Sequence, residues 1–362
     1  MKWYSDAMLI TTLNDIGVAL QENKRMSKPT NWAICGAGQI SNDFCICVNS
    51  LPKTEHSILA IAAKDQARAK EFASLHSIPK SFGSYEELLQ VPNLDIVYIG
   101  TIHPFHVETC LLFLNAGINV LCEKPVALSM EGCHKVLDAA KKNNVLFVEG
   151  WWSRFFPVYK FMREEVLVKG AIGDVKIIEA SFCGPKLTQK RLDKWQLGGG
   201  GLTDIGAYGI QAANMFFKGK PSIVKAEVAY TETGEDKSGV ILLKYPSGQL
   251  ACLNYSMETA EGVNHLIIRG TKGNVVIPDK LWCPTQVYIN GKKHEFQLPE
   301  VKDKEKFNFT NCEGFTYEIQ CIRECLLRGD KECSTVPHED TEVIMSVLTD
   351  VLKQVGIKYS SL

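Results

Sequence analysis

The sequence predicts an α/β fold: a doubly wound parallel sheet followed by an α+β domain with an open-faced, mostly antiparallel sheet. From Asn31 to Gly150, short apolar runs alternate with longer helical stretches, the pattern of parallel βαβ units. After Gly150, strands of alternating polarity follow one another through turn signals such as Tyr245-Pro246-Ser247-Gly248, which favours antiparallel pairing. The length of 362 residues, at about 150 per domain, favours two domains.

The first domain is predicted over residues 29–150. Residues 1–28 form an extension that we leave outside the fold as a frayed or disordered segment. Ser84 and Glu87 form a capping box, which opens a short helix ending at Gln90. The predicted strands are 32–35, 57–63, 95–100, 119–121 and 145–148, and the other helices begin after residue 38, at 65, near 104 and near 129.

The second domain is predicted over residues 151–338, and a final helix within 339–362 is expected to pack back on the first domain. A helix over 158–169 leads into the strands, a helix over 203–217 interrupts them, and a helix over 314–327 follows. The predicted strands are 175–182, 224–231, 240–245, 250–256, 265–269 and 275–278.

Composition and charge exclude several classes of protein. Hydrophobic residues make up 45% and charged residues 22% of the chain, typical of a globular protein and not of a disordered one. The 40 Lys and Arg nearly cancel the 41 Asp and Glu, so no nucleic-acid partner is expected. No uncharged apolar run approaches the about 20 residues of a membrane span. The 13 cysteines contain no C-x-x-C pair, which favours buried thiols in a reducing cytoplasm over disulfides or a zinc site.

A glycine turn follows the first predicted strand and opens a helix. Gly36 allows a tight turn, and Gly38 lets a pyrophosphate approach backbone N–H groups at the positive end of the helix. Ser41 takes the place of the third small residue, which must permit close packing of helix and strand. This context predicts a Rossmann domain that binds a dinucleotide. The alternative is an ordinary strand–helix turn.

The end of the second predicted strand bears on the choice of nucleotide. An NAD site usually places a carboxylate there to bind the ribose 2′-OH. Here Lys64 precedes Asp65, and Arg68 follows one helical turn later, so two cations are placed to neutralise a 2′-phosphate. We therefore predict NADP, while Asp65 leaves NAD as the alternative and a solvated basic face as the simplest interpretation.

Three motifs together resemble the Gfo/Idh/MocA oxidoreductase family: the glycine turn, Glu123-Lys124-Pro125 after a buried strand, and Asp204-x-Gly206-x-Tyr208 on a later helix. The resemblance covers about residues 30–358. It implies a Rossmann domain, an open-faced sheet domain and a homodimer formed through that sheet. Many members carry Asp-x-Gly-x-His-x-x-Asp, whereas this chain has Tyr208 at the His position and Gln211 at the last Asp. That departure resembles the branch that oxidises trans-dihydrodiols, and it puts inositol dehydrogenase activity in doubt.

The resemblance assigns the catalytic roles to Lys124, Tyr208 and Asp204. A free tyrosine has a pKa of about 10, so a tyrosine base needs a neighbouring cation to lower that value. Lys124 is expected to supply this cation and to orient the substrate, while Tyr208 acts as acid and base. Asp204 is expected to fix the lysine, although its simplest role is to cap a helix. The alternative is that Lys124 itself takes the proton, as an amine of lowered pKa.

The resemblance also assigns a cofactor-binding set around the two later strands of the first domain. His103 and His106 line the cofactor cleft, with Tyr98 near the coenzyme and Glu123 beside the catalytic lysine. An i,i+3 histidine pair is also a candidate metal site, but no third ligand is evident, so no metal is expected. For Tyr98 the simple alternative is an aromatic residue packed in the core.

Aromatic residues cluster at the predicted domain junction and suit a cyclic apolar diol. Trp152, Phe155 and Phe156 are the candidates for this wall, and Arg154 is expected to hydrogen-bond the substrate hydroxyls. Trp282 and Phe309 are weaker candidates, and core packing explains some of these aromatics equally well.

The activity that the resemblance implies is NADP-dependent oxidation of trans-1,2-dihydrodiols of aromatic hydrocarbons to catechols, with D-xylose and related aldopyranoses as further substrates. Two alternatives stay open. One is a dehydrogenase acting on sugars alone, and the other is a nucleotide-binding regulator without turnover. Retention of the three catalytic residues speaks against the regulator.

Overall fold

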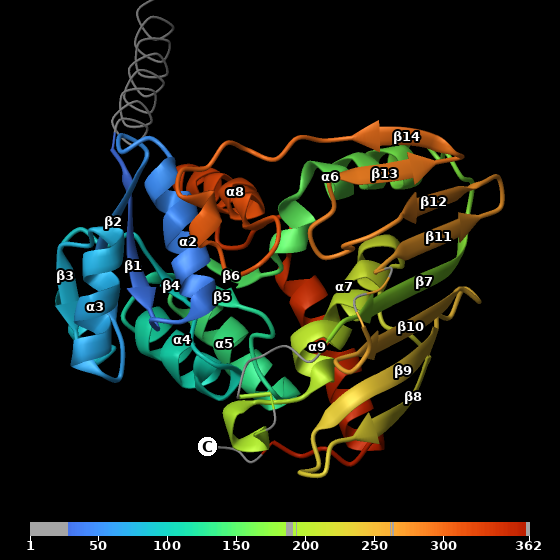
Figure 1. Ribbon diagram of the computed structural model, residues 1–362, viewed down its shortest axis with the longest axis horizontal. Helices are drawn as coiled ribbons and strands as arrows, with labels where there is room; N and C mark the ends of the chain where they lie inside the picture. The colour runs from blue at the N-terminus through green and yellow to red at the C-terminus, as the bar shows by residue number, and fades with distance from the viewer. Residues whose placement is uncertain (1–27, 186–190, 193, 261, 263, 360–362) are drawn as a thin grey trace, which may run out of the picture.

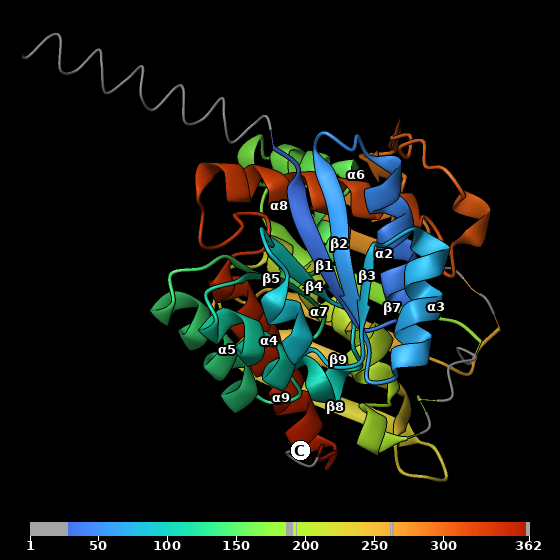
Figure 2. The same cartoon turned by 90° about the vertical axis from the view of Figure 1, so that its left-hand side faces the viewer.

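The computed structural model describes residues 28–185, 191–192, 194–260, 262 and 264–359, so the predicted extension lies outside it apart from Lys28. Six parallel strands form the first sheet, in the order β3-β2-β1-β4-β5-β6 (Figure 1). Figure 2 shows α2 and α3 on one side of this sheet and α4 and α5 on the other. The doubly wound prediction is confirmed. The elements are β1 (Thr30–Cys35), α2 (Gln39–Ser50), β2 (His56–Ala62), α3 (Gln66–His76), β3 (Lys80–Phe82), β4 (Ile96–Ile99), α4 (His106–Asn115), β5 (Asn119–Glu123), α5 (Met130–Lys142) and β6 (Phe147–Gly150).

Helices on both faces explain why the sequence signal for this sheet is strong. Every residue of β4 is buried, and β1 is nearly so, which requires the continuous apolar runs that the sequence shows. Strand β3 has three residues, none of them buried, so its apolar signal is too weak to predict. The strand order reverses between β1 and β4, and ligands bind at such a switch point, beyond the carboxyl ends of the strands.

Eight strands form the second sheet, in the order β14-β13-β12-β11-β7-β10-β9-β8. Among the described strand pairs of this second sheet, only β7 and β10 run parallel. The prediction of a mostly antiparallel sheet is therefore also confirmed. Helices α6, α7 and α9 lie along one face, and the other face is open (Figure 1). The elements are α6 (Pro157–Arg163), β7 (Val175–Cys183), α7 (Ala207–Phe216), β8 (Ile223–Tyr230), β9 (Asp236–Lys244), β10 (Leu250–Ser256), β11 (Leu266–Gly270), β12 (Asn274–Ile277), β13 (Gln286–Ile289), β14 (Lys292–Glu295), α8 (Phe315–Arg328) and α9 (His338–Gln354).

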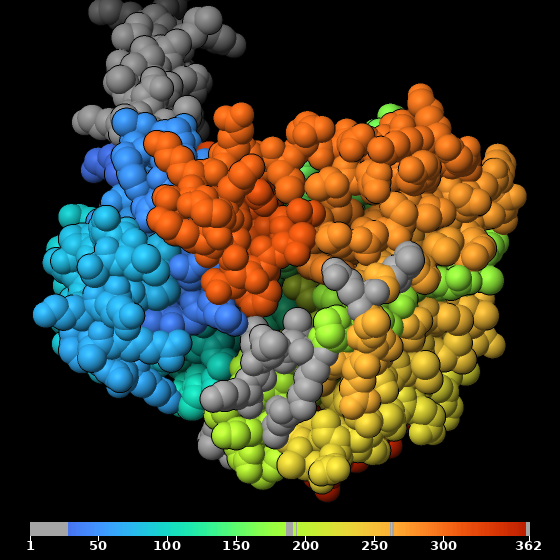
Figure 3. Space-filling view, viewed as in Figure 1, coloured from blue at the N-terminus to red at the C-terminus, as the bar shows by residue number. Residues whose placement is uncertain are grey.

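The last two helices connect the domains. Helix α8, which the sequence groups with the second domain, packs against α2 of the first, and Arg323 donates from Nη1 to Thr30 Oγ1 at 2.9 Å. Helix α9 contacts α5 of the first domain but also α7 and β8 of the second. Figure 3 shows the orange segment around residues 300–330 covering the junction between the blue first domain and the second sheet. No helix in the described part of the chain is long and apolar enough to cross a membrane.

Arg154 holds α9 to the second domain. It lies in the 3₁₀ turn η3 (Trp152–Phe155), and its side chain is fully enclosed. Its Nη1 donates to Asp340 Oδ2 at 2.5 Å, and its Nη2 donates to Asn214 Oδ1 at 2.6 Å. Its Nε donates to Gln211 Oε1 at 3.1 Å. The guanidinium therefore donates its hydrogen bonds to other side chains of the protein. This differs from the predicted contact with substrate hydroxyls.

We expect Asp340→Asn to lower the free energy of unfolding by about 1–3 kcal/mol, since it removes the charge opposite a buried guanidinium while keeping the side-chain size. Urea denaturation measures this change. The matched control is Glu131→Gln in the exposed Glu131–Lys135 pair, which should leave the free energy of unfolding nearly unchanged. Equal costs for the two variants would contradict the anchoring role of Arg154.

Candidate active site

The glycine turn lies at the carboxyl end of β1, at the switch point. Gly36 has φ of 100°, and a Cβ there would lie 3.0 Å from the carbonyl oxygen of Gly100, so the turn requires glycine. Ser41 is buried in the first turn of α2, and its hydroxyl has no hydrogen-bond partner among the described residues. A Cβ on Gly100 would lie 2.2 Å from Ser41 Oγ. Ser41 therefore fits at the third position of the motif because glycine faces it.

The residues at this turn fit the diphosphate of a dinucleotide. Gly38 is the N-cap residue of α2, no side chain caps that helix end, and its first turn carries no acidic residue. The N–H groups at a helix N-terminus favour an anion. When bound, the nicotinamide dinucleotide supplies the hydride acceptor.

The end of β2 carries exposed cations beside the glycine turn. Arg68 Nη2 donates to the Ala37 carbonyl oxygen at 2.7 Å, which places the guanidinium against the turn itself. Lys64 Nζ lies 3.3 Å from the centroid of the Phe105 ring. The Asp65 carboxylate caps α3 and accepts from the N–H groups of Ala67 and Arg68, so the acidic group here has a structural partner.

Lys124 joins the two domains at the carboxyl end of β5. Its peptide bond with Pro125 is cis. The buried Nζ donates to the Asp204 carbonyl oxygen at 2.6 Å and lies 4.9 Å from the centroid of the Tyr208 ring. Burial lowers the pKa of Lys124, although the charges of Asp204 and Glu123 act in the other direction.

Asp204 lies inside the helical turn 202–206, which leads into α7. Its carboxylate pairs with Arg191. Burial raises its pKa, but the charges of Arg191 and Lys124 outweigh this effect and hold the pKa below its usual value. The expected capping role falls instead to Asp236, which accepts from the backbone N–H of Leu202 at 2.5 Å. Neither Arg191 nor Asp236 stands in a sequence pattern that predicts its place.

Tyr208 faces Lys124 with its ring and not with its hydroxyl. The hydroxyl accepts a hydrogen bond from Trp152 Nε1 at 2.9 Å. Burial and the charge of Glu123 raise the pKa of Tyr208 well above 10. The expectation that Lys124 lowers this pKa is therefore wrong for this structure, because the ammonium lies over the ring face and burial dominates.

Three aromatic side chains contact Tyr208, namely Trp151, Trp152 and Phe182. Trp152 reaches its hydroxyl, and Phe182 packs against its ring with 5.6 Å between centroids. Trp282 stacks on Phe182 at 3.9 Å. Phe182 escaped the sequence prediction, although its position near the end of a predicted strand was a usable signal.

The other predicted wall residues lie elsewhere. Phe155 and Phe156 are enclosed in the core, where Phe156 packs so closely on Gly314 that a Cβ there would lie 2.0 Å from the ring. The segment of Phe309 is attached to α2, because the Phe309 N–H donates to Asp43 Oδ2 at 3.0 Å. Of these predicted residues the structure thus brings Trp152 to Tyr208 directly and Trp282 through Phe182, and no contact joins Phe155 or Phe156 to Tyr208.

The remaining predicted cofactor residues are buried behind the edge of the sheet. Tyr98 stacks on Phe44 at 3.8 Å and donates to Glu123 Oε1 at 2.8 Å. Burial raises the pKa of Glu123 to about 7. Tyr98 is thus a core residue that holds Glu123 in place beside Lys124.

The two histidines support the loops around Lys124. His106 places one ring nitrogen 2.8 Å from the Pro125 carbonyl oxygen and the other 2.9 Å from the Thr101 carbonyl oxygen. Burial lowers its pKa to about 4, although hydrogen bonds to these two carbonyl oxygens act in the other direction. His103 Nδ1 lies 3.3 Å from the Gly198 carbonyl oxygen. No third metal ligand joins this pair among the described residues.

The site combines a glycine turn at a switch point with a buried lysine that reaches a tyrosine and an aspartate of the second domain. This combination is typical of a dinucleotide-dependent oxidoreductase. Family comparison agrees. Residues 30–150 match the model described as "Oxidoreductase family, NAD-binding Rossmann fold", and residues 163–276 match the GFO/IDH/MocA C-terminal domain. The chain belongs to the Gfo/Idh/MocA oxidoreductase family.

Curated relatives cover nearly the whole chain. The chain is 43% identical over 331 residues to trans-1,2-dihydrobenzene-1,2-diol dehydrogenase of Xenopus laevis, covering 91% of this chain and 99% of that one. It is 41% identical over 330 residues to the enzyme of the same name from Bos taurus, covering 91% and 97%.

Solved structures share the fold at lower identity. A 3-ketoreductase from Actinomadura kijaniata, in complex with NADP and TDP-benzene, has a TM-score of 0.76 at 23% identity and covers 90% of this chain and 98% of that one. Levoglucosan dehydrogenase in complex with NADH and levoglucosan has a TM-score of 0.77 at 17% identity, covering 91% and 98%.

Proposed function

We propose that the protein is an NADP-dependent dehydrogenase that oxidises trans-1,2-dihydrodiols of aromatic hydrocarbons to catechols. The observation that carries this proposal is the meeting of Lys124 and Tyr208 with the aromatic wall of Trp152, Phe182 and Trp282. A flat, apolar ring with two hydroxyls matches such a site, because the wall suits the ring and the polar pair suits the hydroxyls. The dihydrodiol dehydrogenase names of the relatives support the same substrate class.

The reaction removes a hydride from one carbinol carbon and a proton from its hydroxyl. When bound, NADP⁺ would accept this hydride. The resulting ring ketone tautomerises to the catechol, because this restores aromaticity. The residues of the chain must therefore orient one hydroxyl and accept its proton.

We assign the proton acceptor to Lys124. Its lowered pKa makes the neutral amine more accessible near neutral pH, whereas the raised pKa of Tyr208 makes a phenolate less so. In this assignment Tyr208 stays protonated and donates a hydrogen bond to the substrate hydroxyl. Asp204 holds the lysine through its carbonyl oxygen. A neutral amine is needed at the start, so activity should rise with pH through the pKa of Lys124.

The role assignment predicts different outcomes for two variants. Lys124→Arg keeps the positive charge but cannot release a proton near neutral pH, so kcat should fall by about 10²–10⁴-fold. Tyr208→Phe removes a donor and not the base, so it should cost about tenfold and retain the rise of kcat with pH. Steady-state pH profiles measure both effects. If Lys124→Arg retained activity while Tyr208→Phe lost 10²-fold or more, Tyr208 would be the acceptor.

The preference for NADP rests on Lys64 and Arg68, since Asp65 is engaged in capping α3. Lys64→Asp should raise the KM for NADP⁺ about 10–100-fold and change that for NAD⁺ only slightly, because it converts attraction for the 2′-phosphate into repulsion. Lys70→Asp makes the same charge change at an exposed position of α3 and serves as the control. Equal effects of Lys64→Asp on both nucleotides would refute the preference.

Turnover with a panel of dihydrodiols and pentoses, each with NADP⁺ and NAD⁺, tests the reaction class. The proposal expects trans-dihydrodiols to give the highest kcat/KM, with D-xylose as a slower substrate. Turnover of sugars alone would favour a sugar dehydrogenase. Nucleotide binding without turnover of any member would favour a regulator.

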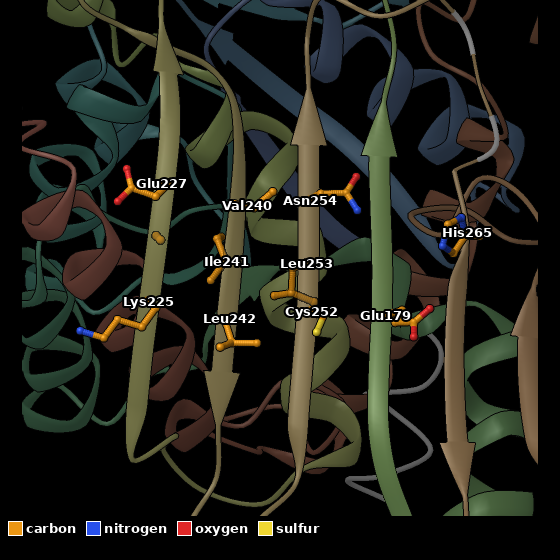
Figure 4. Close-up of a pocket in the computed structure, with 11 residues that line it drawn as sticks. Glu179, Lys225, Glu227, Val240, Ile241, Leu242, Cys252, Leu253, Asn254 and His265 are labelled. Carbon is orange, nitrogen blue, oxygen red and sulfur yellow. The ribbon is translucent and has the colours of Figure 1, made fainter.

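We also propose a homodimer formed through the open face of the second sheet. Figure 4 shows this face, where Val240, Leu242 and Cys252 lie between the charged residues Lys225 and Glu179 of neighbouring strands. Val240 is 58% exposed and Leu242 is 42% exposed, on adjacent outward positions of β9. An exposed apolar stripe of this kind is typical of a protein–protein interface. The family resemblance supports a second copy as its partner.

Leu242→Glu should convert the dimer into a monomer, because it places two like charges near the centre of a symmetric interface. Light scattering at micromolar concentration measures the mass. Leu75→Glu, on the exposed surface of α3, is the control and should leave the mass unchanged. A monomeric mass for the unmodified protein would refute the dimer.

A further inference from the structure

Three cysteine thiols meet outside the site described above. Cys321, Cys325 and Cys333 place their sulfur atoms within 4.8 Å of one another, and the Cys321–Cys333 pair is 3.8 Å apart. Cys325 and Cys333 are buried, while Cys321 is half-buried. Among the described residues this is the one group of three side chains that could hold a metal ion.

The fold around α8 brings these thiols together. Cys321 and Cys325 stand four residues apart on α8, so their side chains share one helix face. Gly329 ends the helix in the left-handed conformation, with φ of 77°, and turns the chain back. The returning segment forms a bridge between Cys333 and Val336, which places the third sulfur over that face.

One contact brings positive charge to these sulfurs. Arg328 Nη2 lies 3.5 Å from Cys325 Sγ. Thiolate is the form of cysteine that binds metals, and a neighbouring cation stabilises it.

We propose that Cys321, Cys325 and Cys333 form a binding site for a thiophilic d¹⁰ metal ion, Zn²⁺ or Cu⁺. With metal–sulfur bonds of about 2.3 Å, two thiolates on one tetrahedral ion are about 3.8 Å apart. The observed Cys321–Cys333 separation equals that value, and the other two need only small side-chain adjustments. Soft thiolate ligands select Cu⁺ and Zn²⁺ over harder cations.

The half-buried position of Cys321 has a consequence for coordination. Cu⁺ is satisfied by three thiolates, whereas Zn²⁺ takes a fourth ligand, which water can supply from the Cys321 side. The site lies between α8 and the segment that leads to α9, and the Lys331 carbonyl oxygen of that segment accepts from the Phe147 N–H of β6 at 3.3 Å. A bound ion would therefore fasten this connection to α8, a structural role independent of the proposed dehydrogenase activity.

The test uses the full-length protein, reduced and then freed of reductant without oxygen. Titration with Cd²⁺, a spectroscopic probe for thiolate sites, should give an ultraviolet thiolate-to-metal band that saturates at about one ion per chain. Cys321→Ser and Cys333→Ser should lose this band, and Cys183→Ser, at a half-buried thiol of β7, should keep it. Competition of Zn²⁺ and Cu⁺ against bound Cd²⁺ then identifies the preferred ion. The preferred ion should raise Tm in the unmodified protein and in Cys183→Ser only.

Several results would overturn the proposal. One is the absence of a saturable band, and another is an equal band in the unmodified protein and in Cys321→Ser. A third is that peroxide oxidises Cys321 and Cys333 to a disulfide in a protein that takes up neither metal, which would make the group a redox pair. Because Cys321 is half-buried, Cys321→Ser gives a result even if Cys333→Ser does not fold.

Discussion

The buried ammonium of Lys124 is the group on which the arrangement of the site depends. A charge in this position is costly unless it is paired and hydrogen-bonded. Its partner is the Asp204 carbonyl oxygen, 2.6 Å away, and that atom belongs to the other domain. Arg191 in turn pairs with the Asp204 carboxylate. This hydrogen bond of the lysine therefore forms only when the domains are docked, so the contact that completes the fold also fixes the position of Lys124.

The two closing helices maintain this docking from opposite sides. Helix α8 packs against α2, which begins at the glycine turn, and also against the η3 turn that carries Trp152. Helix α9 lies against α5, α7 and β8, with Asp340 paired to Arg154. Elements far apart in the sequence thus fix the distance between the glycine turn and the aromatic residues around Tyr208. This explains why neither closing helix belongs to a single domain.

The sequence was most informative where local backbone chemistry determines the structure. Gly36 could be placed because its positive φ and its contact with Gly100 admit only glycine, and the alternating runs around it predicted the sheet. Lys124, Asp204 and Tyr208 could be grouped because a family resemblance supplied their relation. No local pattern indicates that Arg154 meets a carboxylate 186 residues away, or that Cys333 returns to α8.

The direction of the pKa shift of Tyr208 was the other property that the sequence could not predict. The presence of a lysine beside a tyrosine suggests a lowered tyrosine pKa, but that outcome needs the cation at the hydroxyl. Here it lies over the ring, and enclosure by the surrounding side chains dominates. Only coordinates distinguish these two placements. The same applies to Phe182, whose stacking on Trp282 depends on two separate strands and loops.

The packing of Ser41 against Gly100 makes the nucleotide motif a property of two distant segments. The space that a third glycine provides in a continuous fingerprint is provided here by a glycine after β4, 59 positions along the chain. The two positions should therefore vary together among relatives: a larger residue at one requires a smaller residue at the other. A search that demands glycine at every fixed offset of the first loop would overlook chains that divide this requirement between two strands.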